Sequence, residues 1–500
     1  MQRCVARRRR LPSVTRLTHP CLDYPSMIRA GDTGENRTMA MTELIAQRGL
    51  PARIADLIAL AAQPVATNAE LLRLLRAIYQ AVLSADLDDY DVAVIKPHIA
   101  QLRNDLFRVR DEMRGRIAAW HAAGLMDHAV QLALRDCFRA TRFASDMLGE
   151  LSAGFTELAA GQTPLKAFSG PGNTIVAAAF DTDELATFQA GDVLLMRGLH
   201  HNSAAIARIG DVDSQFSHIC ILHIDKQGAQ WVVESLIEEG AVITKLGAAL
   251  AHGNGRAILF RHRDRALAAK AGQIAHKHIR RTYGTWKRRI LYDFSMQLDN
   301  RRPLFCSKLV RLAYARASKG KLLLPSFTTR FNMKNRDFID RIGVQAVETY
   351  APGDIEIEPH FDLVAEWQDF RVTSRLRAQD LIMVKLFEWM DNYGYKFEQD
   401  GLIRIISLFG RFAAHLSDRA KEMLSSVVPK VPINMPRKTI AAIAMLHKTA
   451  EPLLDEIRSL EAEHISRTGK PMHPRQVYAA LEDIRMRSDG RIGYLVLPIA

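Results

Sequence analysis

The chain has 500 residues and a formal net charge of +13 at pH 7. This length predicts two to four structural units. Because 48% of the residues are hydrophobic, a wholly disordered chain is excluded, and 29 glycines and 19 prolines are too few for a collagen-like or low-complexity chain. The excess of lysine and arginine favours an acidic partner, such as nucleic acid, anionic lipid or another acidic polymer.

The N-terminal 40 residues, 1–40, are predicted to be a disordered basic extension. Eight arginines and three acidic residues give the first 38 positions a charge of +5. A secretory signal peptide is not expected, because no apolar stretch follows the four arginines at 7–10. The arginine-rich, acid-poor start also has the character of a mitochondrial transit peptide, and Met39 or Met41 is an alternative start of the protein.

Residues 41–165 are predicted to form a helical domain. Apolar residues recur there at spacings of three and four, which is typical of amphipathic helices whose apolar faces form a bundle core. Examples are the stripes Leu71, Leu72, Leu74, Leu75, Ile78 and Leu83; Leu102, Leu106, Val109 and Met113; and Ala129, Leu132, Phe138 and Leu148.

The pattern changes near residue 165, and residues 166–372 are predicted to form an α+β domain. Turn-forming residues at 168–173 are followed by short apolar runs of strand length. Helical patterns return at 265–281 and again after Cys306. The predicted strands are 174–179, 192–196, 217–224, 230–235, 257–260 and 362–367.

The last part, 373–500, is predicted to be a C-terminal helical domain. The order of the chain is therefore helices, an α+β middle and helices again, without an internal repeat of fixed period. The expected helices are 381–389, 402–416, 439–446 and 453–464, and the prolines Pro429, Pro432 and Pro436 mark a linker among them.

The cysteines are too few and too scattered for a disulfide framework or a structural zinc site. Their number is odd, and no two of them are separated by only two residues. A reducing compartment fits best, and we predict a cytoplasmic protein. No run of 18 apolar residues occurs, so no membrane span is expected. The five cysteines are Cys4, Cys21, Cys137, Cys220 and Cys306.

Two residues on neighbouring predicted strands have complementary chemistry. His218 opens one strand, Glu234 lies on the next, and a turn around 225–228 joins them. With a loop of three or five residues, the two side chains share a face of the hairpin, directly opposite or diagonal. A carboxylate there fixes the tautomer of the histidine and raises its basicity. The alternative interpretation is a core histidine and a surface glutamate.

Cys306 is predicted to lie at or just before the start of a helix. Apolar residues between 309 and 313 follow it at helical spacing and form the buried face. The partial positive charge and free N–H groups of a helix start stabilise a thiolate and can bind an oxyanion. A buried structural cysteine is the alternative. With His218 and Glu234, this cysteine completes the residue types needed for nucleophilic acyl chemistry.

Five short segments within 185–372 occur in a specific order. They are Ala190-Gly191-Asp192-Val193-Leu194-Leu195, Ser217-His218-Ile219, Val233-Glu234-Ser235, Tyr292-Asp293-Phe294 and Phe305-Cys306-Ser307-Lys308-Leu309-Val310. In this order they resemble the circularly permuted papain-like, NlpC-type hydrolases of the YiiX-like group. That group has a GDLL-like strand, an SH strand, an acidic residue on the next strand, a YD segment and then CSELV. As in the permuted group, the cysteine here comes last.

The resemblance implies a papain-like α+β fold, with an antiparallel sheet packed on helices, and it implies a catalytic triad. Cys306 corresponds to the nucleophile and His218 to the general base. Glu234 corresponds to the residue that orients His218. The resemblance requires no cofactor.

The resemblance also implies that Tyr292 and Asp293 line the substrate cleft, together with Ser307 and Lys308 beside the nucleophile. The family has Glu at the position of Lys308. We expect a lysine there to lower the pKa of Cys306 further or to change the substrate preference.

Histidines and a cysteine between 200 and 223 also raise the question of a zinc site. His218 and Cys220 share one face of the predicted strand, whereas His223 points to the other. No ligand spacing typical of zinc occurs, so we predict no metal site. The residues of this stretch are His200, His201, His218, Cys220 and His223.

Residues 256–289 concentrate positive charge, with eleven lysines and arginines against one acidic residue. Without this segment and the N-terminal extension, the remaining residues sum to −2. We predict a surface for an anionic substrate or anionic lipid, and a solvated face or a docking surface for the flanking helices is the alternative. Nucleic acid is not expected, because no recognisable nucleic-acid-binding module accompanies the segment. The candidates are Arg280, Arg281, Lys287, Arg288 and Arg289.

We therefore predict a thiol-dependent hydrolase or acyltransferase that cleaves an amide or ester bond, in a peptide or a lipid, through an acyl-thioester. The alternative is a catalytically inactive papain-like module that docks on an anionic membrane or an acidic partner through residues 256–289. The sequence predicts no particular oligomeric state.

Overall fold

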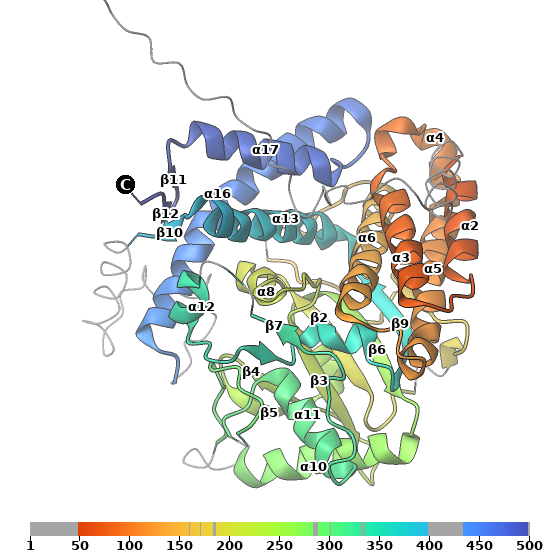
Figure 1. Ribbon diagram of the computed structural model, residues 1–500, viewed down its shortest axis with the longest axis vertical. Coiled ribbons are helices and arrows are strands. Elements are labelled where there is room, and N and C mark those ends of the chain that lie inside the picture. Colours follow the sequence, from red (N-terminus) through yellow and green to blue (C-terminus); the bar gives the residue numbers. More distant parts are fainter. Residues whose placement is uncertain are drawn as a thin grey trace, which may run out of the picture.

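The computed structural model describes residues 49–159, 161–170, 172–183, 187–283, 289–300, 302–331, 333, 336–398 and 434–498. In these ranges a helical region, a large sheet and a second helical region pack together (Figure 1). No helix within them is long and apolar enough to cross a bilayer. The extension 1–40, the helix 402–416 and the prolines Pro429 and Pro432 of our sequence predictions lie outside the described residues.

The N-terminal helices pack as a bundle beside the sheet (Figure 1). Thr67 and Glu70 form a capping box at one helix start, and the Asp127 side chain caps another, so both starts are encoded locally. The predicted apolar stripes lie on buried faces, as Leu71 and Ile78 illustrate. The helices are α2 (Leu50–Ala61), α3 (Asn68–Leu83), α4 (Val92–Ile95), α5 (Ile99–Ala122) and α6 (His128–Ser152), with 3₁₀ turns at Leu87–Asp89 and Lys96–His98.

The middle region forms a seven-stranded antiparallel sheet in the order β1-β9-β6-β2-β3-β4-β5, which confirms the predicted α+β class. Each predicted strand is present, but β5 was not predicted, because its apolar run is only three residues long. The strands are β1 (Thr174–Val176), β2 (Val193–Gly198), β3 (His218–Ile224), β4 (Gln230–Leu236), β5 (Gly240–Lys245), β6 (Asn254–His262) and β9 (Phe361–Gln368).

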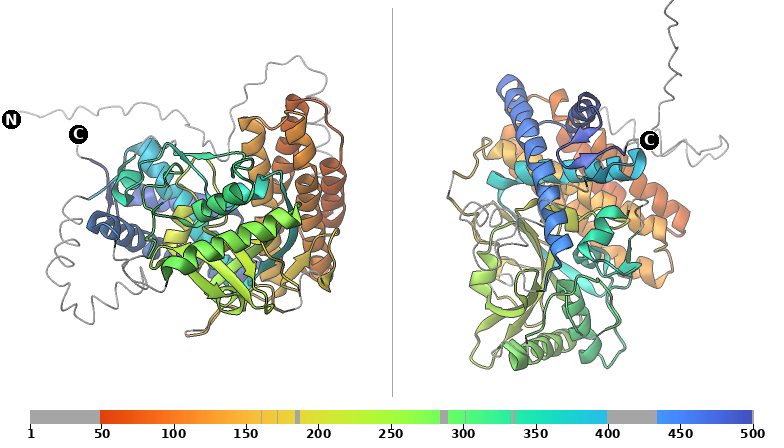
Figure 2. Two further views of the ribbon diagram at one scale, coloured as in Figure 1. Left: turned by 90° about the horizontal axis from the view of Figure 1, so that it is seen from below. Right: turned by 90° about the vertical axis from the view of Figure 1, so that its left-hand side faces the viewer.

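The two faces of the sheet are covered by different helices. Odd-numbered residues of β3, such as Ile219 and Ile221, face α10 (Arg265–Tyr283) and α11 (Cys306–Ala317). Even-numbered residues of the same strand, such as Leu222, face α9 (Leu246–Leu250). This alternation follows from the two-residue period of a strand, and Figure 2 shows α10 lying across the strands.

Two glycines allow α10 to lie close to the sheet. A Cβ atom on Gly272 would come within 2.2 Å of the backbone oxygen of Leu222. A Cβ atom on Gly191, whose φ is +86°, would come within 2.1 Å of the backbone oxygen of Ala268. Side chains at these two positions would therefore push the helix off the sheet.

Buried ion pairs connect the sheet to the helices beside it. Glu366 of β9 accepts hydrogen bonds from Arg110 of α5 at 2.7 Å and from Arg142 of α6 at 3.0 Å. We call these and the neighbouring pairs the interface network. Because charges are costly to bury alone, such pairs fix how the helices are placed on the sheet. The other pairs are Arg135–Asp354, Arg142–Glu356, Arg197–Asp380, Arg208–Asp380, Arg256–Asp146, Arg377–Glu150 and Arg377–Glu461.

The C-terminal region is dominated by α13 (Phe370–Tyr393), α16 (Arg437–Thr468) and α17 (Pro474–Arg487). The predicted helices 439–446 and 453–464 are one continuous helix, α16, with Pro452 inside it. The shorter elements are α8 (His201–Ile206), α12 (Asp337–Ile342), the 3₁₀ helix Pro352–Ile357, the strand pair β7 (Thr329–Arg330) and β8 (Glu348–Thr349), and a sheet of β10 (Lys396–Phe397), β11 (Arg491–Ile492) and β12 (Leu495–Val496).

Candidate active site

Cys306 is the first residue of α11 and is only 5% exposed. Leu309, Val310 and Ala313 anchor this helix in the core beneath the sheet. The sulfur of Cys306 is hydrogen bonded by the backbone N–H groups of Ser307 and Ile219. The predicted helix start is therefore present, and it places the cysteine against the first turn of α11 and the beginning of β3.

His218 and Glu234 lie side by side at the end of the β3–β4 hairpin. Ile224 pairs with Gln230, so the loop between the strands has five residues, and the two side chains are diagonal neighbours. Nε2 of His218 and Oε2 of Glu234 are 2.8 Å apart. The hairpin geometry that the sequence suggested is thus present.

The structure brings these three side chains into one hydrogen-bonded chain. Since Nε2 of His218 faces Glu234, Nδ1 is the nitrogen left for the hydrogen bond between His218 and Cys306. Burial lowers the pKa of His218, but the hydrogen bonds and charges of Cys306 and Glu234 outweigh it and raise this pKa to about 10. Both neighbours therefore favour the imidazolium.

The thiol of Cys306 shifts in the complementary direction. Burial raises its pKa, but the hydrogen bond and the charge of His218, together with the N–H groups of Ile219 and Ser307, lower it overall. The pair is therefore arranged to exist as thiolate and imidazolium. Chemically, a thiolate beside an imidazolium has the form of an activated nucleophile.

Two other described cysteines have the opposite environment. Cys137 lies in the helical bundle, and Cys220 lies in the apolar layer between the sheet and α9. Both are buried. Burial raises the pKa of each thiol well above its ordinary value. Of the three described cysteines, only Cys306 has a lowered pKa.

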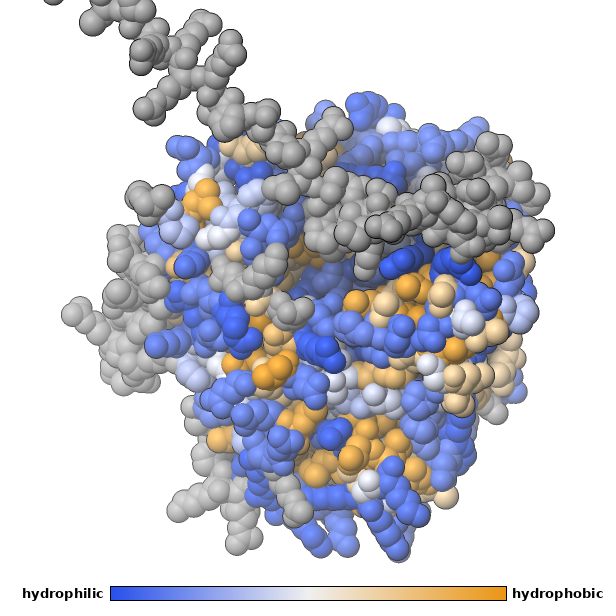
Figure 3. Space-filling model, in the orientation of Figure 1, coloured by the Kyte–Doolittle hydropathy of each residue, from blue (hydrophilic) through white to orange (hydrophobic). Residues whose placement is uncertain are grey.

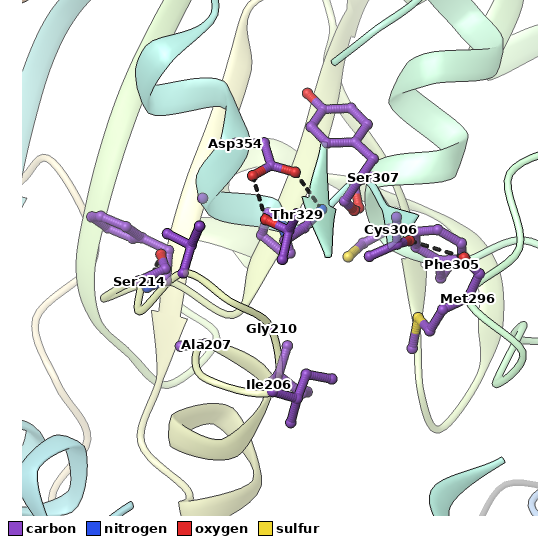
Figure 4. A pocket seen from close by; sticks show the side chains of 18 of the residues that line it. Ile206, Ala207, Gly210, Ser214, Met296, Phe305, Cys306, Ser307, Thr329 and Asp354 are labelled. Carbon is purple, nitrogen blue, oxygen red and sulfur yellow. Dashed lines mark hydrogen bonds between the residues drawn. The ribbon is translucent and has the colours of Figure 1, made fainter. Parts of the chain in front are cut away.

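A cavity of about 570 Å³ adjoins Cys306. Figure 4 shows the Cys306 side chain on one side of this space, with Ile206 and Gly210 on the other. Many of the lining residues are apolar, and the polar or charged ones are Arg135, Ser214, Ser307, Thr329, Thr349 and Asp354, besides the tyrosines. We call this space the nucleophile cavity.

A second cavity, of about 530 Å³, shares part of its wall with the nucleophile cavity. The far side of the second cavity is built by residues of α12 and α16, including Ile342 and Leu446, and only Asn202 and Thr439 bring polar side chains to it. The C-terminal helical region therefore contributes to the surroundings of the site. The residues that line both cavities are Ile206, Ile209, Tyr292 and Met296.

The four predicted cleft residues divide into two pairs. Tyr292 and Ser307 line the nucleophile cavity, although the Ser307 hydroxyl is engaged by the backbone oxygen of Tyr350. Asp293 and Lys308 do not line it. They form an ion pair with 2.6 Å between Nζ and Oδ2, and both side chains are 3% exposed.

This ion pair corrects what the sequence led us to expect of Lys308. Its ammonium group is satisfied by Asp293 and by the side-chain oxygen of Asn300, away from the sulfur of Cys306. The helical period explains the difference, because residue 308 points to another side of α11 than residue 306. The expected influence of Lys308 on the Cys306 pKa and on the cleft therefore has no support in the geometry.

The basic segment 256–289 is divided between buried and exposed side chains. Arg256 and Arg261 are buried in ion pairs with Asp146 and Asp192, and Arg289 pairs with Glu239 at 2.9 Å. Strand β6 directs Arg256 and Arg261 into the protein, so these two arginines do not contribute to a basic surface. Lys287 and Arg288 lie outside the described residues.

The exposed part of this segment lies on α10. Arg280 and Arg281 are exposed near its C-terminal end, and hydrophilic residues cover the lower edge of the molecule in Figure 3, where α10 lies in Figure 1. Burial and the charges of Arg316, Arg302 and Arg281 lower the pKa of His278 to about 4. His278 is therefore neutral at pH 7, and the positive charge at this helix end comes from the arginines.

The histidine-rich stretch at 200–223 does not assemble into one cluster. His218 contacts Glu234, Cys220 is buried in the apolar layer, and the His223 ring lies 4.4 Å from that of His276. His201 instead contacts Glu451 of α16. Strand alternation and chain direction thus separate residues that are close in sequence.

Sequence reasoning missed the groups that surround the nucleophile from distant segments. These groups are the backbone N–H of Ile219 and the residues of α8 and α16 that line the two cavities. None of them belongs to a recognisable sequence motif. The only available signal was the position of Ile219 beside His218, which places its N–H group at the same strand end.

Comparison with known proteins supports the recognised resemblance. Residues 187–365 match a family described as permuted papain-like amidase enzyme, YaeF/YiiX, C92 family. No curated protein and no solved structure matches the chain. The predicted similarity to permuted papain-like enzymes is therefore confirmed for this segment, and with it the general class of cysteine hydrolases.

Proposed function

We propose that this protein is a cysteine hydrolase that cleaves an amide or ester bond, with Cys306 as nucleophile, His218 as general base and Glu234 as the residue that positions His218. The proposal proceeds from the similarity of residues 187–365 to permuted papain-like amidases. One observation carries it: Cys306, His218 and Glu234 form a hydrogen-bonded chain at the wall of a cavity.

In the proposed mechanism, His218 takes the thiol proton and the thiolate of Cys306 attacks the carbonyl carbon. The carbonyl electron pair moves to oxygen, and backbone N–H groups at the start of α11, including that of Cys306, stabilise the oxyanion. As the oxyanion collapses, the C–N or C–O bond breaks, and the His218 imidazolium protonates the leaving amine or alcohol.

The resulting acyl-thioester is then hydrolysed. His218 deprotonates a water molecule, whose oxygen attacks the thioester carbon. Collapse of the second oxyanion breaks the C–S bond, releases a carboxylic acid and restores the thiol. An alcohol or amine acceptor in place of water would give acyl transfer by the same steps.

The lining of the cavities supports an apolar acyl group as the part of the substrate held beside Cys306. Ile209, Tyr292 and Met296 separate the nucleophile cavity from a second space that is almost wholly apolar. An apolar chain gains free energy by leaving water for such a space, about 25 cal/mol per Å², whereas a charged peptide side chain loses its hydration. A lipid ester or a fatty amide fits this site better than a polar peptide.

The alternative of a non-catalytic docking module has less support. It depends on the basic segment 256–289, and Arg256, Arg261 and Arg289 of that segment are engaged by carboxylates of the protein. It also gives no reason for the complementary pKa shifts at Cys306 and His218.

Labelling with a thiol-reactive acyl probe, followed by peptide mapping, tests the proposal. We expect acylation of Cys306 in the native protein, loss of that modification in Cys306→Ala, and its retention in Cys137→Ala. Cys137 is a suitable control because it is also buried but has a raised pKa. No acylation of Cys306 in natively folded protein, judged by circular dichroism, would overturn the enzyme assignment. Active protein would then be assayed on a panel of amides and esters.

A further inference from the structure

A cluster of two histidines and a glutamate lies outside the candidate active site, between α8 and α16. His201 is the first residue of α8 and is 1% exposed. Its Nε2 lies 2.7 Å from Oε2 of Glu451, and its ring centroid lies 5.3 Å from that of His447. His447 and Glu451 are four residues apart, so they lie one above the other on the same face of α16.

The donor atoms of this cluster converge on one point. One donor atom from each of the three residues lies within 4.8 Å of the other two. Two atoms bonded to one zinc ion at about 2.1 Å are separated by at most about 4.2 Å. Ion binding requires the partly exposed His447 and Glu451 side chains to rotate, and it replaces the hydrogen bond between His201 and Glu451.

The chemistry of the donors selects a class of ion. Two imidazole nitrogens and one carboxylate oxygen suit zinc and its neighbours in the first transition row, whereas calcium and magnesium prefer all-oxygen sites. His447 and Glu451 are partly exposed, so a fourth position remains open to water. Three protein ligands and one water is a regular arrangement for zinc.

The surroundings hold the donors in place. Arg375 lies 3.6 Å from Oε1 of Glu451, which leaves Oε2 directed at His201. Nδ1 of His201 is buried without a hydrogen-bond partner among the described residues. The ring is thus held through Nε2 alone, on the side of Glu451.

We propose that His201, His447 and Glu451 bind a divalent transition-metal ion, with Zn²⁺ as the best match. The ion would connect α16 to α8 of the papain-like region. Ile206, the last residue of α8, lines both cavities beside Cys306. Metal binding would therefore fix one wall of the nucleophile cavity. This site stands independently of the proposed hydrolase function, because it uses none of the triad residues.

Metal titration of the full chain tests the site. The protein carries Cys306→Ala throughout, since a thiolate next to His218 would itself bind metal, and it is first freed of metal with a chelator. We expect one equivalent of Co²⁺ to give the visible absorption of a tetrahedral site, and Zn²⁺ to displace it. Zn²⁺ should also raise the melting temperature.

Variants of the cluster assign the binding to these residues. In His447→Ala and in the more conservative Glu451→Gln, we expect Zn²⁺ affinity to fall at least tenfold and the rise in melting temperature to disappear. Lys448→Ala, an exposed neighbour on the same helix, should behave like the parent protein. Absence of saturable Co²⁺ or Zn²⁺ binding, or unchanged affinity in both cluster variants with native circular dichroism, would overturn the proposal.

Discussion

Buried charges occur in two regions of this protein, and their partners differ in kind. In the interface network, burial would raise the pKa of Glu366, but Arg110 and Arg142 lower it to about 2. At the candidate active site, Cys306 and His218 also shift each other toward their charged forms. The network consists of guanidinium groups and carboxylates, whereas the candidate site pairs a thiol with an imidazole.

The two regions also differ in whether empty space lies beside the charged groups. Glu366 and its two arginines are at most 4% exposed, whereas Cys306 lines a cavity. A strongly shifted pKa alone therefore does not distinguish a structural ion pair from a reactive one. What distinguishes the two is the empty space beside the pair and the type of acid–base pair.

The largest expected effect is on stability, from a break in the interface network. Glu366→Gln leaves Arg110 and part of Arg142 buried without a compensating charge, so we expect a loss of about 3–5 kcal/mol in the free energy of unfolding. Denaturant unfolding measures it. Asp362→Ala, on the same strand, is the matched control, because its pair with Arg263 is nearly 40% exposed and should contribute about 0–1 kcal/mol. Equal losses in both variants would contradict the comparison.

A smaller effect, on catalysis rather than stability, is expected at Glu234. Glu234→Gln keeps the shape of the side chain but removes its charge, so we expect kcat/KM to fall about 10²-fold while the melting temperature stays unchanged. Glu234 is one of the causes that raise the pKa of His218. Its removal lowers that pKa, so the alkaline limb of the pH–rate profile, near pH 10 in the native protein, moves to lower pH. An unshifted limb would show that Glu234 does not act through His218.

A bulky side chain placed in the cavities tests whether they hold the acyl chain of the substrate. Ile209 lies between the two cavities, so a tryptophan there shortens the room for an apolar chain. For Ile209→Trp we expect about a tenfold lower kcat/KM on long-chain acyl substrates and little change on acetyl substrates. Val94→Trp, at a position 67% exposed, is the control for adding an indole. An equal loss on both chain lengths would argue against an acyl-binding cavity.

The smallest effect is expected for the exposed arginines of α10. Arg280→Ala combined with Arg281→Ala removes charges that lie on the surface, so we expect the free energy of unfolding to change by less than about 0.5 kcal/mol per substitution. Activity on a small uncharged substrate should be unchanged. A loss of activity on that substrate would show that this helix end belongs to the catalytic region after all.

Local patterns in the sequence were sufficient for much of the fold and for the core of the candidate site. Short apolar runs of strand length, most of them bounded by turn or polar residues, predicted β1, β2, β3, β4, β6 and β9. The two-residue period of a strand placed His218 and Glu234 on one face. The apolar spacing after Cys306 predicted the start of α11.

Other features depend on which distant segments meet, and no local period encodes that. Lys308 was expected beside the nucleophile, but it pairs with Asp293, which lies on a different segment. Arginines of β6 were expected on the surface, but carboxylates from elsewhere in the chain receive them inside the protein.

The sequence by itself therefore determined six of the seven strands of the large sheet and the helix start at Cys306, since these follow from neighbours a few positions apart. Only the tertiary structure decided which charges are compensated, where empty space remains beside Cys306, and that His201 meets His447 and Glu451. The physical reason is that burial and electrostatics depend on three-dimensional proximity, and the partners here are separated by as many as 256 positions in the chain.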